Sequence, residues 1–173
     1  MSTSSCHLVL HPDPVLRAKA EPVEVFDEGL KTLAEEMIRV RKEHAGIGLA
    51  APQVGHSIRM FVCNTEEEGE EDRIFVNPEI LETSGDLEWA EEGCLSLPEI
   101  HGSVRRPSFV RIRAQDLDGN TFELESDDLH ARVWLHENDH LDGVMILDRM
   151  RPLDRLASRR AVKHLESIYQ SGG

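Results

Sequence analysis

Apolar residues recur at helical spacing in the first third of the chain. Between residues 27 and 46 they fall at every third or fourth position: Leu30, Leu33, Met37 and Val40. This spacing places them on one face of a helix, which Asp27 can cap and Gly46 can end. The segment GIGLAAPQVG (46–55) contains three glycines and a proline, so it is predicted to form a loop.

Alternating apolar and polar positions predict strands in the middle of the chain. Segments 57–64 and 73–80 show this alternation, and the second is expected to break at Pro78. Residues 109–125 form two alternating runs around a central Asp-Gly pair, which predicts a hairpin. Strands in the middle with helices on either side indicate an α+β fold.

Two further helices are predicted in the C-terminal third. Residues 127–141, DDLHARVWLHENDHL, return to helical spacing, and one face carries four positions of interest: Leu129, Val133, His136 and His140. The two histidines therefore continue an apolar stripe inward. A last helix is predicted over residues 153–169.

Composition narrows the class of protein. A length of 173 residues predicts one domain spanning 1–173, and no apolar run is long enough to suggest a signal peptide or a membrane span. The three cysteines, Cys6, Cys63 and Cys94, form no close pair, which argues against disulfides and favours the reducing cytoplasm. The net charge of −14 disfavours a general surface for DNA or other nucleic acids.

The charge is unevenly distributed. Residues 66–72, EEEGEED, carry six acids and one glycine, and they are expected to form a solvated, mobile loop. Residues 149–163 carry six arginines and lysines against one aspartate, which gives +5. This basic segment is either a solvated helix that balances nearby acids or a surface for RNA phosphates, whose contacts weaken with salt.

The pattern His-Glu-x-x-His at His136, Glu137 and His140 indicates a metal site. Two imidazoles one helical turn apart can converge on one ion, and Glu137, about 100° around the helix, can reach a water on that ion without ligating it. A third ligand is needed, and Cys94 in the segment EEGCLSLP can supply a thiolate. The alternative for a free cysteine is a buried apolar thiol, which suits the other two cysteines better.

Three ordered motifs resemble those of the peptide deformylase family: GIGLAAPQVG, EEGCLSLP and LHENDHLDG. Weaker matches are LHPDPVLR (10–17) and FVNPEI (75–80), so the resemblance covers residues 7–150. It implies an α+β fold with antiparallel or mixed sheets around a central metal-binding helix, with an N-terminal and a C-terminal helix.

The resemblance also implies a reaction, namely hydrolysis of the N-terminal formyl group of formyl-methionyl nascent polypeptides with release of formate. The cysteine and the two histidines are implied to bind a divalent metal, most often Fe²⁺, although these ligands also accept Zn²⁺, Ni²⁺ or Co²⁺. Glu137 is implied to activate the metal-bound water. The Gln53 side chain and the Leu95 N–H are implied to stabilise the oxyanion.

Several residues are candidates for binding the peptide. Gly46 and Gly48 would let an extended substrate approach the loop backbone closely and add there as a strand. Ile47, Leu129 and Val133 are candidate walls of a methionine pocket, although these apolar residues could equally belong to the core.

The sequence departs from the family pattern at three positions: Ala45, His101 and Leu135. Leu135 stands where the family usually has glutamine, which predicts altered packing rather than lost activity. Ala45 and His101 replace a polar and a basic residue, which leaves open how the far end of the peptide is held. The retained Arg106 and Asp139 are expected to pair and to fix the ligand helix.

Alternatives to the deformylase reaction stay open on the sequence. A relative with this fold could act on another acyl group or peptide, or could bind peptides without catalysis, although retention of Glu137 and Gln53 argues against pure binding. A zinc endopeptidase shares His-Glu-x-x-His but recruits its third ligand downstream, which leaves EEGCLSLP unexplained.

The resemblance also favours contact of the basic C-terminal helix with the ribosome.

Overall fold

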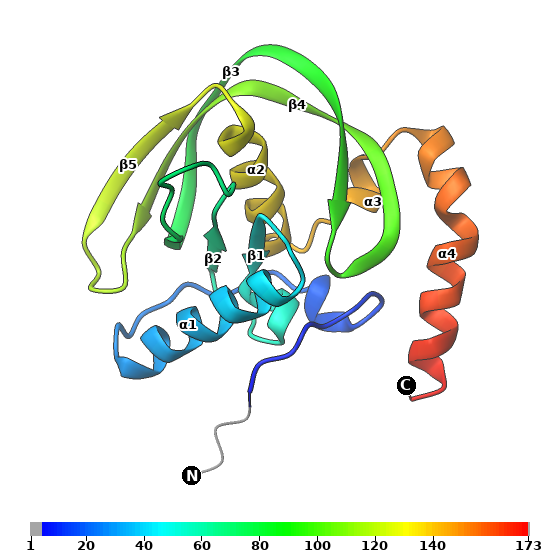
Figure 1. The fold of residues 1–173 in the computed structure, drawn as a ribbon, viewed down its shortest axis with the longest axis horizontal. Coiled ribbons are helices and arrows are strands. Elements are labelled where there is room, and N and C mark those ends of the chain that lie inside the picture. The colour runs from blue at the N-terminus through cyan, green and yellow to red at the C-terminus, as the bar shows by residue number, and fades with distance from the viewer. Residues whose placement is uncertain (1–4, 173) are drawn as a thin grey trace.

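The computed structural model describes residues 5–172, and its centre is one five-stranded antiparallel sheet in the order β1-β2-β3-β4-β5. The strands are β1 Gly48–Ala50, β2 Met60–Cys63, β3 Arg73–Cys94, β4 Leu97–Gln115 and β5 Thr121–Ser126. β3 and β4 are long and curved, and together with β5 they arch over one helix, α2 (Figure 1). The predicted α+β class is confirmed.

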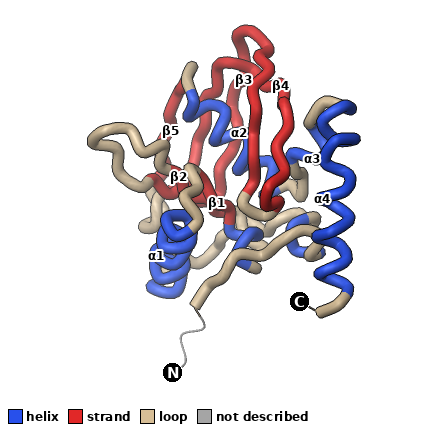
Figure 2. The backbone as a smooth tube through the Cα atoms, turned by 45° about the vertical axis from the view of Figure 1, so that its right-hand side comes forward, coloured by secondary structure: helices blue, strands red, loops and turns tan. Residues whose placement is uncertain are grey.

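Within residues 5–172, four α-helices surround or fill this sheet: α1 Glu28–Glu43, α2 Leu129–Leu141, α3 Ile146–Arg149 and α4 Pro152–Gln170. α2 lies within the curve of the sheet, whereas α1 and α4 lie at opposite ends of the molecule (Figure 2). Among the helices of the described residues, none is both long and apolar enough to cross a membrane.

The strand at Arg73 does not break at Pro78, so this sequence-based expectation is wrong. Val76 pairs with Gln115, but the next pair on β3 is Glu79 with Arg113, so the ladder shifts at this point. Pro78 lies in the resulting bulge, where its missing N–H removes no regular ladder bond. β3 then continues to Cys94.

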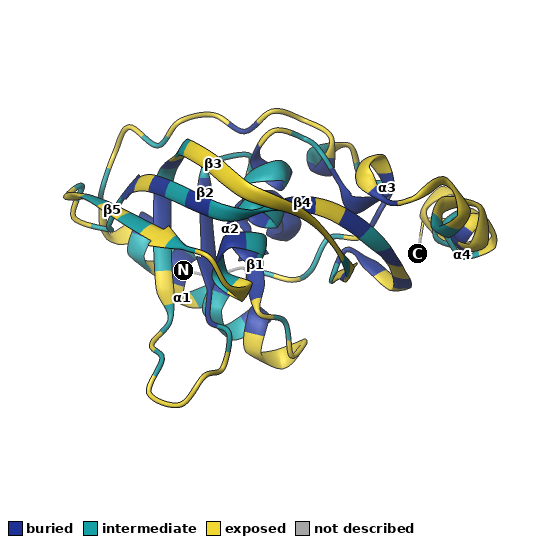
Figure 3. Ribbon diagram, turned by 90° about the horizontal axis from the view of Figure 1, so that it is seen from above, coloured by how far each residue is buried: buried dark blue, intermediate teal, exposed yellow. Residues whose placement is uncertain are grey.

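The middle of β3 gives little sequence signal because one long stretch of it is exposed. Its residues show no alternation of buried and exposed positions over eight consecutive sites, 82–89, and this stretch is yellow in Figure 3. β4 likewise begins at Leu97 instead of near residue 109, so the predicted hairpin contains only the end of β4 and all but the last residue of β5. Pairing with β4, not burial, keeps this part of β3 extended.

α1 begins as predicted, because the Asp27 side chain accepts a hydrogen bond from the Leu30 N–H at 3.0 Å. It ends at Glu43, however, and the residue with a left-handed backbone is Ala45, with φ of 53°. A Cβ on Gly46 would lie 2.7 Å from Leu95 Cδ1, so a larger residue there would require the Leu95 side chain to shift. The helix stop was therefore placed at the wrong residue.

Two main cores hold the layers together. One lies between α2 and the inner face of the sheet, where the Phe61 and Phe75 rings stack with centroids 4.6 Å apart and Trp134 packs against them at 5.7 Å. Leu135 packs against this core. The other lies between α1 and the short strands β1 and β2. α2 is thus held firmly from the sheet side, which leaves its opposite face for the site.

The acidic segment 66–72 is more ordered than its composition suggested. Glu70 is half-buried and accepts hydrogen bonds from the backbone N–H and hydroxyl of Thr65 and from His130. Asp72 is also half-buried and pairs with Arg41. The expectation of a purely solvated loop is therefore wrong at these two residues, each of which has a partner 31 or more residues away in the sequence.

His130 joins this loop to the start of α2 and makes stability depend on pH. Its two ring nitrogens lie 2.9 Å from Glu70 Oε1 and 2.9 Å from Asp128 Oδ1. Burial alone lowers the pKa of His130, but the hydrogen bonds to the two carboxylates outweigh burial and raise it above its usual value. A raised histidine pKa stabilises the fold below the unfolded pKa of about 6.5, and the contribution is lost as pH rises through the folded pKa.

We therefore expect His130→Gln to lower the free energy of unfolding by about 1 kcal/mol at pH 6 and by clearly less at pH 9. Urea unfolding at both pH values measures the difference. The matched control is His164→Gln on the exposed surface of α4, which should change stability little at either pH. An equal loss at pH 6 and pH 9 for His130→Gln would contradict the ion-pair explanation.

Candidate active site

Three potential metal ligands converge between β3 and α2. Cys94 Sγ, at the end of β3, lies 3.4 Å from His140 Nε2, which lies 3.3 Å from His136 Nε2. These three atoms are all within 4.8 Å of one another. Cys94 and the two histidines of α2, 42 and more residues apart along the chain, are thus brought together as the sequence predicted.

The chemistry of these donors suits a divalent transition metal. One thiolate and two imidazoles form a common set of three protein ligands that leaves a further position open. The Nδ1 atom of His136 lies 2.9 Å from Glu92 Oε1, so its Nε2 is turned toward Cys94 and His140. Burial and the neighbouring His136 lower the pKa of His140, which keeps that imidazole in the neutral form that ligates metals.

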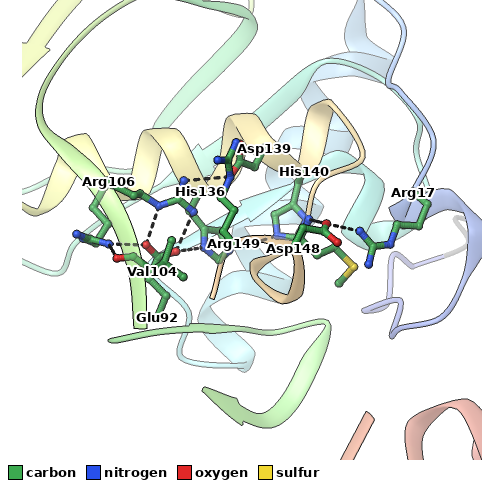
Figure 4. A network of polar contacts seen from close by, with 11 residues as sticks. Arg17, Glu92, Val104, Arg106, His136, Asp139, His140, Asp148 and Arg149 are labelled. Carbon is green, nitrogen blue, oxygen red and sulfur yellow. Dashed lines mark hydrogen bonds and ion pairs between the residues drawn. The ribbon is translucent and has the colours of Figure 1, made fainter. Parts of the chain in front are cut away.

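Glu92 contacts His136, one of the candidate ligands, and is itself held by hydrogen bonds (Figure 4). Arg106 donates to both of its carboxylate oxygens, at 2.7 and 2.9 Å, and Arg132 donates at 2.7 Å. Burial alone raises the pKa of Glu92, but the hydrogen bonds from His136 and Arg106 outweigh it and hold that pKa well below its usual range. Glu92 is therefore ionised, and it orients the His136 ring.

The predicted pair of Arg106 and Asp139 is confirmed, with Nη1 and Oδ2 3.0 Å apart. Asp139 also accepts hydrogen bonds from Arg149. Glu92, by contrast, was missed, because a glutamate beside another glutamate usually indicates a solvated surface. Only its position two residues before Cys94, on the same side of a strand, distinguishes it.

Glu137 lies beside the converging ligands and is almost completely buried. Its side-chain Oε2 atom has no hydrogen-bond partner among the described residues, and burial raises the pKa of Glu137 to about 7. A Cβ on Gly48 would lie 2.5 Å from Glu137 Oε1. The carboxyl group therefore occupies space that only glycine leaves open at position 48.

Gln53 lies in a short 3₁₀ helix, Ala51–Val54, directly after β1, and 1% of it is exposed. Its Oε1 accepts from the Ala50 N–H at 3.0 Å, and its Nε2 donates to Ser96 Oγ at 3.1 Å and to Cys94 Sγ at 3.5 Å. The amide is thus locked next to the candidate metal centre. Ser96 was not singled out from the sequence.

A cavity of about 660 Å³ opens beside these groups, with Cys94, His136 and Glu137 among its lining residues. All five residues expected to bind the peptide line it: Gly46, Ile47, Gly48, Leu129 and Val133. Leu129, for which core and pocket were equal expectations, is 47% exposed and therefore does not belong to the core, whereas Val133 is buried. Ala45 and His101 also line the cavity.

Comparison with known proteins gives a consistent assignment. A sequence model described as polypeptide deformylase matches residues 5–156. The chain is 49% identical over 148 residues to a peptide deformylase of Thermotoga neapolitana, covering 86% of this chain and 88% of that protein. It is 46% identical over 165 residues to the chloroplastic peptide deformylase 1B of Solanum lycopersicum, covering 94% of this chain and 59% of that longer protein.

A solved structure agrees with these sequence matches. Peptide deformylase from Plasmodium falciparum superposes with a TM-score of 0.92 at 39% identity, covering 95% of this chain and 98% of the other. Sequence and fold together show that this chain belongs to the polypeptide deformylase family.

Proposed function

We propose that this cavity hydrolyses the formamide bond of N-formyl-methionyl polypeptides through the residues described above. As a family member, the chain is a metal-dependent hydrolase that removes N-terminal formyl groups. The observation that carries the assignment of residues is the convergence of Cys94, His136 and His140 beside a buried carboxyl group, at one end of a cavity open to solvent.

Cys94, His136 and His140 would hold one divalent metal ion, and we propose Fe²⁺. The family resemblance supports Fe²⁺, whereas the softness of one thiolate and two imidazoles accepts Fe²⁺, Zn²⁺, Ni²⁺ and Co²⁺ alike. When bound, such an ion supplies Lewis acidity, which polarises a carbonyl and makes a water more acidic. Glu92, itself held by Arg106, would keep the imidazole of His136 oriented for binding such an ion.

Glu137 is proposed to take a proton from the attacking water and to pass it to the leaving amine. A pKa of about 7 is close to the pH of the reaction, where a carboxyl group can both accept and donate a proton. Its unpartnered Oε2 supports this role, because no other side chain competes for the proton.

The Gln53 side chain and the Leu95 N–H are proposed to stabilise the oxyanion. The Nε2 atom of Gln53 is 3.5 Å from Cys94 Sγ, so its amide hydrogens are near the reacting position. Leu95 follows Cys94 directly. One donor of this kind contributes about 3 kcal/mol to the transition state.

The peptide is proposed to lie along β1, the edge strand of the sheet. Backbone contacts there would accept many sequences, which suits an enzyme acting on varied nascent chains. Ile47, Leu129 and Val133 would surround the methionine side chain. Three free thiols among the described residues support a reducing compartment, and we place the reaction in the cytoplasm.

Replacing Gly48 tests the packing of Glu137. Gly48→Ala is expected to lower kcat by about 10²-fold, because the new methyl group would displace the carboxylate by the order of 1 Å. Steady-state formate release measures the loss, and metal content should stay unchanged. Gly29→Ala, in the first turn of α1, is the control and should leave kcat intact. Full activity of Gly48→Ala would show that the placement of Glu137 tolerates this shift.

Formate release from formyl-Met-Ala-Ser by protein purified without oxygen tests the function itself. The acetylated peptide is the control for acyl specificity, and metal is measured on the same samples. Release from the formylated peptide alone supports the proposal. No release by metal-loaded protein would favour a changed acyl or peptide specificity.

We also propose that α4 contacts the ribosome. Four exposed cations support this: Arg155, Arg159, Arg160 and Lys163. None of them belongs to an ion pair within residues 5–172. The basic segment is not one helix, because α3 ends at Arg149 and α4 begins at Pro152. Two of its cations already have partners, since Arg149 binds Asp139 and Arg151 lies 4.4 Å from the Trp89 ring centroid. Co-sedimentation with ribosomes should weaken with salt and on replacing the four cations with glutamine.

A further inference from the structure

A buried arginine lies behind the peptide-binding side of the cavity. Arg41 is in α1, and only 1% of it is exposed. Its Nη1 donates to the Gly46 carbonyl at 2.7 Å and to Glu66 Oε1 at 2.8 Å, and its Nη2 donates to Asp72 Oδ1 at 2.8 Å. A guanidinium is tolerated in a protein interior only where acceptors of this number replace water.

The acidic loop and the pocket segment are joined a second time through Asn64. The Asn64 backbone N–H donates to the Ile47 carbonyl at 2.9 Å. Its side chain donates to Asp72 at 3.3 Å and accepts from the Glu66 N–H at 2.8 Å. Two successive carbonyls of the pocket segment, those of residues 46 and 47, are therefore held by the same small group of residues.

This support matters because the pocket segment lacks a favourable conformation of its own. Ala45 has a positive φ of 53°, which costs a non-glycine residue about 1 kcal/mol. Gly46 and Ile47, which follow it, line the cavity. The Arg41 side chain and Asn64 therefore hold this segment through the carbonyls of Gly46 and Ile47, and the Gly46 N–H adds a local bond to the Arg41 carbonyl at 3.0 Å.

We infer that Arg41 is a positioning residue for peptide binding, acting with Glu66 and Asp72 to fix the backbone of Gly46 and Ile47. The inference rests on the proposed function, since this backbone leads into the edge strand along which the formylated peptide is to lie. Arg41 forms no hydrogen bond with the metal-ligand candidates or with Glu137. Loosening it therefore weakens peptide affinity and leaves the chemical step unchanged.

Two variants of different severity test the inference. Arg41→Lys keeps the charge but loses the fork that reaches three acceptors at once. Glu66→Gln is milder, because Glu66 is 64% exposed and its replacement will not prevent folding. Glu71→Gln, in the same loop, removes the same charge from a residue without an ion pair in the described part of the chain, so it controls for net charge.

The measurements are kcat and KM for formyl-Met-Ala-Ser, with metal content determined on the same samples. KM is expected to rise about ten-fold in Arg41→Lys and about three-fold in Glu66→Gln, with kcat within two-fold of wild type. Glu71→Gln should match wild type. A lower melting temperature with unchanged KM in both variants would overturn the inference, as would a lower kcat at constant KM.

Binding of the product peptide Met-Ala-Ser, measured by calorimetry, separates this inference from the proposed function. If wild type releases no formate from any formyl peptide, the proposed function fails, yet the dissociation constant still tests Arg41. A weaker affinity in Glu66→Gln but not in Glu71→Gln supports the positioning role. Equal affinities in wild type and both glutamine variants would overturn it.

Discussion

Glu137→Gln is expected to keep its metal and to lose about 10³-fold to 10⁴-fold in kcat/KM. The amide has nearly the same shape as the carboxylate, so it fits beside Gly48 without new contacts. It cannot accept the proton of the attacking water or pass a proton to the leaving amine. The assay is formate release from formyl-Met-Ala-Ser at pH 7.5, with metal content measured on the same sample.

The control for Glu137→Gln is Glu125→Gln, an exposed residue on β5, which should have wild-type activity. If Glu137→Gln binds metal normally and retains more than about a tenth of wild-type kcat/KM, another group must act as the base. Loss of metal in this variant would instead place Glu137 among the ligands. Metal analysis distinguishes these two outcomes, because metal content is normal in the first and reduced in the second.

Three of the four α-helices in the described residues were predictable because each is amphipathic in its own sequence, whereas α3, with four residues, is too short to show a period. α1, α2 and α4 were placed within three residues of their observed bounds, since burial on one face imposes a local period. β3 shows the opposite case. Its exposed middle is held by pairing with β4, and a distant partner leaves no periodicity in the strand itself.

The contrast between local sequence signal and distant partners also explains which site residues the sequence predicts and which it does not. Cys94, His136 and His140 carry ligand chemistry in their residue types and spacing, and the structure brings them together. Glu92 and Arg41 are ordinary charged residues in the sequence. Their burial depends on partners 14 to 44 residues away, so only the fold reveals that they are internal.

Composition shows an excess of negative charge, but it does not show which acidic residues form buried ion pairs. Some acids are solvated, but Glu92, Asp72 and Asp139 each neutralise a buried or half-buried arginine around the cavity. Removing one partner of such a pair is costly because the other charge is left in a poorly solvated place. Some of the acidic residues therefore hold the side chains around the cavity in place.

Cys94→Ala is expected to abolish activity by abolishing metal binding. Two imidazoles alone are one ligand short of the three that hold a catalytic metal, and the thiolate is the strongest electron donor of the set. We expect less than about a tenth of the metal content of wild type, and formate release at background. The fold should survive, since Cys94 is only half-buried at a strand end.

Cys63→Ala is the matched control, since it also removes one thiol. Burial raises the pKa of the Cys63 thiol to about 12, so this cysteine is neutral, and it lies in the hydrophobic core. The control should keep its metal and activity, and should lose about 1–2 kcal/mol of stability from the small cavity. If Cys94→Ala held metal as well as Cys63→Ala, the thiolate would not be a ligand. The third ligand would then have to come from Glu137, the one buried carboxyl group beside both imidazoles that has an oxygen without a partner among the described residues.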